Sequence, residues 1–168
     1  MSDAVDAIID QWVAERPDLE EDLWPVQVLG RLQRLGRVLD KEFRSFAAKR
    51  GLELGEFDVL TTLQRSGPPY RLTAGSLLKA AMVTSGAITN RIDRMEAKGL
   101  VERVRDDEDR RTVKIQLTEH GHDITREYMA AHLANEARML GELDREECEQ
   151  LAGSLRKLLE SLGDRSIR

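Results

Sequence analysis

The 168-residue sequence has one cysteine, few aromatic residues and no long apolar run. The single cysteine, Cys148, rules out an internal disulfide, so the fold must rest on a hydrophobic core. That core comes mainly from Leu, Val, Ile and Ala, because aromatics make up only 4% of the chain. No window approaches the roughly 18 apolar residues of a membrane span, and the acidic first residues lack the pattern of a signal peptide. We therefore expect one domain, located in the cytoplasm and without a membrane partner.

Negative charges outnumber positive ones, since the chain has 26 Lys and Arg and 31 Asp and Glu, for a net charge of −5. Such a chain is not a general nucleic-acid binder, whose affinity would come from bulk positive charge. The distribution is uneven, however: residues 71–114 hold 10 basic and 7 acidic residues, and the remainder is strongly acidic. Any DNA contact should lie in 71–114 and depend on specific docking more than on bulk charge.

Motifs of catalysis and of metal binding are missing. The chain has no phosphate-binding glycine loop, no nucleophile elbow and no metal-ligand cluster, so we expect neither an enzyme nor a bound cofactor. His120 and His122 are two residues apart and do not share a helix face, and no cysteine joins them or His132 at ligand spacing. Cys148 stands between two glutamates, which disfavour the thiolate that a redox sensor needs.

What the chain does have is two short helical segments followed by two short strands. The pattern predicts, in order, a helix at 73–81, a helix at 84–99, a strand at 100–105, a charged turn at 106–111 and a strand at 112–117. Thr73, and either Thr84 or Ser85, can cap the helices, and Gly99 suits a helix end. The order is that of a winged helix-turn-helix, so the predicted fold class is mainly α with a small β-wing.

The second helix of this module has two different faces. Its apolar stripe consists of Ile88, Ile92 and Met95 at i, i+4 and i+7. The other side is small and polar, which allows approach to a major groove and bonds to base edges. The candidate DNA contacts on it are Ser85, Gly86, Thr89, Asn90 and Arg94. The alternative for such a face is an ordinary solvated surface.

The charged turn is the candidate wing. Its Arg110 and Arg111 could enter a narrow minor groove, where the negative potential is strong, and Asp109 could hold an arginine by a bidentate pair. The turn is too polar to be core, and its alternative is again a solvated hairpin. The strand after it alternates apolar and polar residues, as a half-buried strand does.

Residues 85–121 carry a specific resemblance. Their sequence is SGAITNRIDRMEAKGLVERVRDDEDRRTVKIQLTEHG, and it resembles the recognition helix and wing of the MarR family of bacterial transcription regulators. The resemblance extends over about 4–163. It implies a regulator that binds double-stranded DNA, most often as a repressor. Some members have arginine where Glu108 stands, so either wing arginine could be the one that enters DNA.

Helices flank the module on both sides, at 4–16, 19–50, 54–66, 119–140 and 145–162, with Pro25 bending or breaking the second near its start. Thr118 can cap the fourth of these helices, and Asp144 with Glu147 forms a capping box at the start of the fifth. We divide the chain into an N-terminal and dimerisation part at 1–50, the winged helix-turn-helix at 51–118 and C-terminal dimerisation helices at 119–168, all within a single MarR-type domain. The helices at 19–50 and 145–162 carry long apolar stripes: Val28, Leu32, Leu35, Leu39 and Phe43 in the first, and Leu151, Leu155, Leu158, Leu159 and Leu162 in the second.

These stripes need a partner, and we infer a homodimer with interlocked termini, the alternative being a bundle within one chain. A twofold dimer presents two recognition helices to successive major grooves about 34 Å apart. The expected DNA site is therefore a palindrome.

Four residues are candidates for a small-molecule site. Arg91 should lean towards the body of the protein, since it lies about 60° from the inward edge of its helix. Asp58 lies in a largely apolar helix and should be paired, so one interpretation is a brace between Asp58 and an arginine. The stretches DQWVAERPDLE and VLGRLQRL resemble the urate-responsive subgroup of the family. That resemblance implies instead that Trp12, Asp58, Arg91 and Arg103 bind urate or a related purine anion.

Other functions stay open at this point. Related regulators respond to other small anions, among them tricarboxylates, phenolic acids and phosphorylated purine nucleotides. We interpret Trp24 as a residue that covers the core, the alternative being a place in the lining of the ligand pocket. A helical dimer that acts only through protein partners is a further alternative, but it would have no use for Asn90, Arg94 and the wing arginines.

Overall fold

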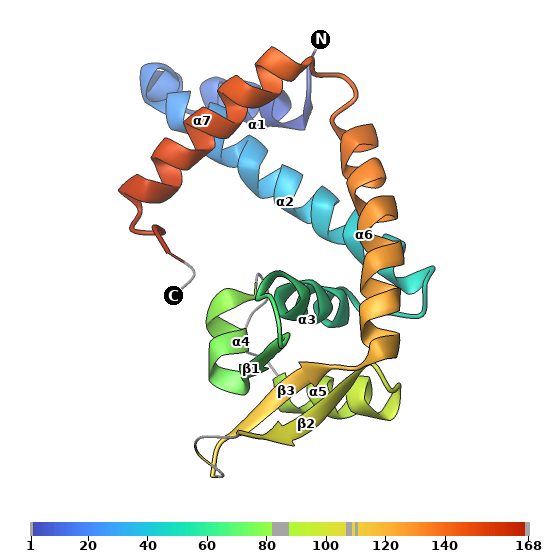
Figure 1. Cartoon of the computed structure of the whole chain (residues 1–168). Helices are drawn as coiled ribbons and strands as arrows, with labels where there is room; N and C mark the ends of the chain where they lie inside the picture. The colour runs from blue at the N-terminus through green and yellow to red at the C-terminus, as the bar shows by residue number, and fades with distance from the viewer. Residues whose placement is uncertain (1, 82–87, 107–108, 110, 167–168) are drawn as a thin grey trace. The chain divides into compact units, whose positions relative to one another are not determined.

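The computed structural model describes residues 2–81, 88–106, 109 and 111–166, which form helices and one small sheet (Figure 1). The chain divides into two compact units, Met1–Gly51 and Leu52–Arg168. No helix within the described ranges is long and apolar enough to cross a membrane.

The first unit is built on α1 (Ala4–Glu15) and α2 (Trp24–Ala48). Asp3 caps α1, because its carboxylate accepts the backbone N–H of Val5 at 2.7 Å. Val5 is buried and would lie 3.2 Å from a Cβ on Gly30, so the two helices approach closely there. Arg31 on α2 pairs with Asp3 and with Asp6, at 2.9 and 2.5 Å. Apolar packing and ion pairs therefore fix α1 on α2.

The predicted helix at 19–50 is divided near its start, as expected from Pro25. The segment Pro17–Leu23 is a separate 3₁₀ helix, η1, and α2 begins only at Trp24. Pro25 explains the boundary, since a residue without a backbone N–H is tolerated only in the first turn of an α-helix. The stripe along α2 is partly exposed in the single chain: Val28 is 52% exposed and Leu35 48%.

The second unit contains the predicted module. The elements are α3 (Leu54–Arg65), β1 (Arg71–Thr73), α4 (Ala74–Ala80), α5 (Ile88–Ala97), β2 (Val101–Arg105) and β3 (Val113–Leu117). The antiparallel sheet has the order β1-β3-β2, with Arg103 opposite Ile115. The core of the second unit consists of fully buried side chains from its helices and from β2: Val59, Leu60, Leu63, Leu77, Met95 and Val101. Both predicted strands of the wing are confirmed, and β1 adds a third strand.

Two helices complete the second unit. Thr118 caps α6 (Glu119–Met139) by accepting the Gly121 N–H at 2.9 Å, as predicted. A Cβ on Gly121 would lie only 2.0 Å from the Leu100 carbonyl oxygen, so glycine allows α6 to approach the start of the wing. The predicted capping box of Asp144 and Glu147 begins α7 (Arg145–Ser161). Among the described residues, α7 contributes none to the buried core.

Candidate nucleic-acid interface and anion site

Helix α5 is the candidate recognition helix. It buries Ile88, Ile92 and Met95, so the predicted apolar stripe is confirmed. Thr89 and Asn90 are exposed, as a base-reading role requires. The other predicted contacts at its start, Ser85 and Gly86, lie outside the described residues, as does the predicted cap at Thr84 or Ser85.

The flank of α5 that faces α3 carries three cations, spaced at i, i+3 and i+7. Arg94 donates from Nη2 to Oε2 of Glu53 at 2.8 Å, and Lys98, directly after the helix, donates to Oε2 of Glu56 at 2.7 Å. Glu56 is fully buried, whereas Glu53 is exposed. Arg94, predicted from the sequence as a DNA contact, is therefore engaged by α3 in the free protein.

Arg91 is the third cation on this flank. Its guanidinium lies against Gly55 of α3, where a Cβ would be only 2.5 Å from Nε and from Cζ. This position agrees with the predicted lean towards the protein body. Its Nε and Nη1 are buried, and no hydrogen-bond partner lies within the described residues. Asp58, half-buried and itself engaged in an interaction, is three residues beyond Gly55 on the same helix.

Arg103 lies on β2 and meets the opposite flank of α5. Its guanidinium forms ion pairs with Asp93 and with Glu96. The hydrogen bond to Asp93 raises the pKa of Arg103, so the pairing favours the charged form. Because residues 91 and 93 are roughly 200° apart around a helix, Arg103 and Arg91 hold different sides of α5. Arg103 thus joins the wing to the recognition helix.

The wing turn is organised by its acidic residues. Asp106 is buried, contrary to the expectation that the turn is too polar for the core, and it pairs with Lys114. The Asp109 carboxylate accepts the backbone N–H of Arg111 at 3.0 Å and the Thr112 hydroxyl at 2.9 Å. In the described part of the chain, Asp109 thus shapes the turn rather than holding an arginine side chain. Arg111 is exposed, and Arg110 lies outside the described residues.

The two tryptophans belong to the first unit. Trp12 on α1 is 49% exposed, so its indole is open for stacking. Trp24 is 71% exposed, so it is not buried in the core of the first unit. It stands at the first position of α2 beside η1, where it lines a groove of about 510 Å³ with Ile9 and Leu23 among its walls.

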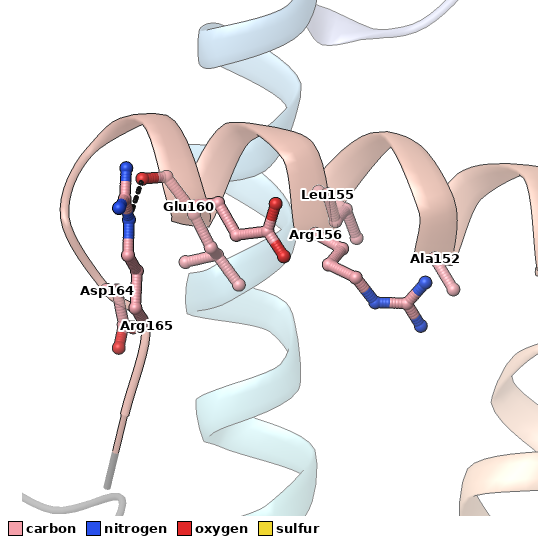
Figure 2. Close-up of a pocket in the computed structure, with 7 residues that line it drawn as sticks. Ala152, Leu155, Arg156, Glu160, Asp164 and Arg165 are labelled. Atoms are coloured by element: carbon pink, nitrogen blue, oxygen red, sulfur yellow. Dashed lines mark hydrogen bonds between the residues drawn. The ribbon is translucent and has the colours of Figure 1, made fainter.

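A groove on the second unit runs along the C-terminal half of α7 (Figure 2). It has a volume of about 680 Å³, and leucines and charged residues line it together: Leu155, Arg156, Leu159, Glu160 and Arg165. Arg165 donates to the Glu160 carbonyl at 3.2 Å, which holds the segment after α7 against the helix. The groove is a feature of one helix face and contains none of the predicted site residues.

Two of the three histidines have ordinary packing roles. His122 Nδ1 lies 2.8 Å from Oε1 of Gln64, and the His132 ring packs edge-on against Phe57. Among the described residues, no group of three His, Cys, Asp or Glu side chains could hold a metal ion.

A helix-turn-helix followed by a charged β-hairpin defines a winged-helix DNA-binding protein. The chain belongs to the MarR family, whose sequence model matches residues 52–113. The HTH-type transcriptional regulator PecS of Dickeya dadantii is 36% identical over 151 residues, which is 90% of each chain. The transcriptional repressor MdtR of Bacillus subtilis is 30% identical over 130 residues, 77% of this chain and 82% of its own. These relatives are regulators of transcription, and this protein is a regulator rather than an enzyme.

Solved structures support the same assignment. AbsC, a MarR family transcriptional regulator from Streptomyces coelicolor, superposes with a TM-score of 0.70 at 26% identity, over 88% of this chain and 97% of its own. The transcriptional regulator BldR from Sulfolobus solfataricus superposes with a TM-score of 0.69 at 28% identity, over 83% of this chain and 96% of its own. The predicted fold class and family are therefore confirmed.

Proposed function

We propose that this protein is a repressor that binds a palindromic operator as a homodimer and leaves DNA when a small anion such as urate binds. The observation that carries the ligand part is the Arg91 guanidinium, which has buried N–H groups without a hydrogen-bond partner among the described residues. A buried, unsatisfied charged group is costly and gains most from an anionic partner. A regulator of this kind acts at the chromosome, so the proposal places it in the cytoplasm.

Apolar faces on both units support the homodimer. Val28 and Val38 on α2 are more than half exposed, and on the second unit Leu159 is 49% exposed and Leu162 75%. Exposed apolar side chains gathered along one helix are typical of association surfaces. A second copy supplies matching faces by symmetry, because a twofold interface pairs the same surface with itself.

The DNA contacts follow from the exposed residues of α5 and of the wing. The Asn90 amide can bond an adenine edge, and Thr89 can bond or pack against bases in the major groove. Arg111 on the wing turn can reach the minor groove. Ser85, Gly86 and Arg110 remain predicted contacts. In a twofold dimer the two α5 helices read half-sites about 34 Å apart.

Chemistry favours urate or a related purine anion as the effector. Urate is planar and carries one negative charge near neutral pH, so a guanidinium can pair with one edge of it and an indole such as Trp12 can stack on its face. Asp58 lies on the α3 face that carries Gly55. A bound anion would repel the Asp58 carboxylate or displace the group that Asp58 contacts. Arg103 acts on the opposite flank of α5, through Asp93 and Glu96.

Arg91 also explains how a ligand could change DNA affinity. Its side chain is rooted in α5, so an anion that draws the guanidinium away from Gly55 also pulls on the recognition helix. Ligand and DNA would then weaken each other's binding by the same factor, as linkage requires.

A mobility-shift titration with the protein's own upstream DNA tests the proposal. Wild-type protein should bind as a dimer, and urate should release it, with xanthine, citrate and a phosphorylated guanosine as comparison anions. Asp58→Asn should bind DNA but lose the urate response, whereas Asp123→Asn, an exposed acid on α6, should respond like wild type. If Asp58→Asn also responds like wild type, the proposed switch is wrong. If only citrate or the nucleotide releases DNA, the proposed assignment of urate as the ligand is wrong.

A further inference from the structure

The recognition helix is tied to α3 by two carboxylates. Glu53 stands at the N-cap of α3 and Glu56 three residues later, and both face the C-terminal end of α5. Arg94 lies 2.8 Å from Oε2 of Glu53, and its Nε is 4.0 Å from Oε1 of Glu56. Lys98 lies 2.7 Å from Oε2 of Glu56. The negative charges are at a helix N-terminus and the positive charges at a helix C-terminus, where each is favoured.

We propose that Glu53 and Glu56 form an acidic clamp that sets the position of the recognition helix, and that Arg94 is a positioning residue rather than a DNA contact. The inference rests on the proposed DNA binding and replaces the sequence-based role of Arg94. It leaves base reading to the N-terminal half of α5, where Thr89 and Asn90 are exposed.

Burial makes the inner half of the clamp rigid. The Glu56 side chain is fully buried, and a buried carboxylate must be paired. Its Oε2 accepts both the Glu53 backbone N–H at 2.9 Å and the Lys98 ammonium. Its Oε1 has no hydrogen bond within the described residues, and the Arg94 guanidinium is the cation beside it. Arg94 therefore compensates a buried charge as well as the exposed Glu53.

The clamp and the proposed anion site share one flank of α5. Arg91, Arg94 and Lys98 all face α3, and only Arg91 lacks a carboxylate partner among the described residues. The C-terminal end of α5 is therefore held, and its N-terminal half is the part free to turn when an anion binds at Arg91. The clamp acts as the pivot of that movement.

A salt series of DNA-binding measurements distinguishes a clamp from a phosphate contact. The variants are Arg94→Gln, Glu53→Gln and the double variant, each checked for folding by circular dichroism. The clamp predicts that each single change weakens operator binding about two- to fivefold, in keeping with an exposed ion pair. The double variant should be no weaker than either single variant, and the slope of log K against log salt should stay at the wild-type value. Arg94→Lys should restore most of the affinity.

Glu102→Gln serves as the matched control, because Glu102 is an exposed acid on the wing strand β2. The Glu102→Gln variant measures how operator affinity changes when one negative charge near DNA is removed. The clamp is overturned if Arg94→Gln lowers the salt slope by about 1.8, the value of one phosphate contact in each of the two subunits, or if Glu53→Gln tightens binding as the control does. Failure of wild-type protein to bind operator DNA is a separate result that would overturn the proposed function itself.

Discussion

Arg91 of the recognition helix occupies the space that a side chain on Gly55 would need. A Cβ at Gly55 would lie 2.5 Å from Nε and Cζ of the guanidinium and 2.7 Å from Nη2. The proposed anion site therefore depends on the absence of a side chain at this position of α3. The contact also links α3 directly to α5. Arg91 lies at one end of the α5 flank that faces α3, and the acidic clamp holds the other end of that flank.

Gly55→Ala should separate ligand response from DNA binding. The new methyl group must displace the guanidinium, which is the far end of a flexible side chain, so the fold should survive with a stability change within about 1 kcal/mol. Operator binding should persist, and the urate response should fall at least tenfold. Gly36→Ala is the control, since its Cβ meets nothing within 4 Å. An undiminished urate response in Gly55→Ala would remove Arg91 from the proposed site.

Lys98→Met should destabilise the second unit. The change leaves the fully buried Glu56 without its closest cation, and we expect a loss of about 2–3 kcal/mol in the free energy of unfolding. Urea denaturation measures it. Lys79→Met on α4 is the control, because Lys79 is exposed and should change stability by less than about 0.5 kcal/mol. Equal effects of the two changes would show that Glu56 does not need Lys98.

Acid should release α1 from α2. The backbone N–H of Val5 lowers the pKa of Asp3, the backbone N–H of Asp3 lowers that of Asp6, and Arg31 lowers both further. A carboxylate with a lowered pKa in the folded state contributes stability that is complete above its ordinary pKa of about 4 and lost as pH falls through the folded value. Hydrogen-exchange protection of α1, measured against the intrinsic rate at each pH, should therefore be high at pH 5 and fall below about pH 4.

Arg31→Gln is the control for that titration. Without the guanidinium, the pKa values of the two aspartates lie closer to their ordinary values, so protection of α1 should be lower than in wild type at pH 5 and should fall by less as the pH is lowered. Protection of α1 that does not depend on pH in either protein would contradict the role of the Asp3 cap and the Arg31 pairs.

Local signals in the sequence were sufficient for most of the fold. Hydroxyl and carboxyl caps at Thr73, Thr118 and Asp144 begin their helices as predicted. Period-2 alternation places β3, and the apolar stripe of α5 is the buried one. These features depend on neighbours within one turn or one strand, so the pattern of residue types determines them.

The parts that sequence reasoning missed depend on contacts between distant segments. Glu53 and Arg94 are 41 residues apart, and nothing in the periodicity of either helix shows that they meet. The spacing of Glu53 and Glu56 can be seen in the sequence, but it indicates a capping box at the start of α3 and says nothing about partners on α5. The exposure of Trp24 was missed for a related reason, because an apolar residue type does not show what covers it.

The most direct test of the central claim follows DNA release and ligand binding in one experiment. Urate is titrated into the complex of the protein with its own upstream DNA, with tryptophan fluorescence and mobility shift recorded on the same samples, for wild type and for Arg91→Gln. We predict that urate quenches the fluorescence and releases wild-type protein over the same concentration range, and that Arg91→Gln stays on DNA. Wild-type protein that binds DNA and is unaffected by saturating urate would contradict the urate switch, as would equal release of the Arg91→Gln variant.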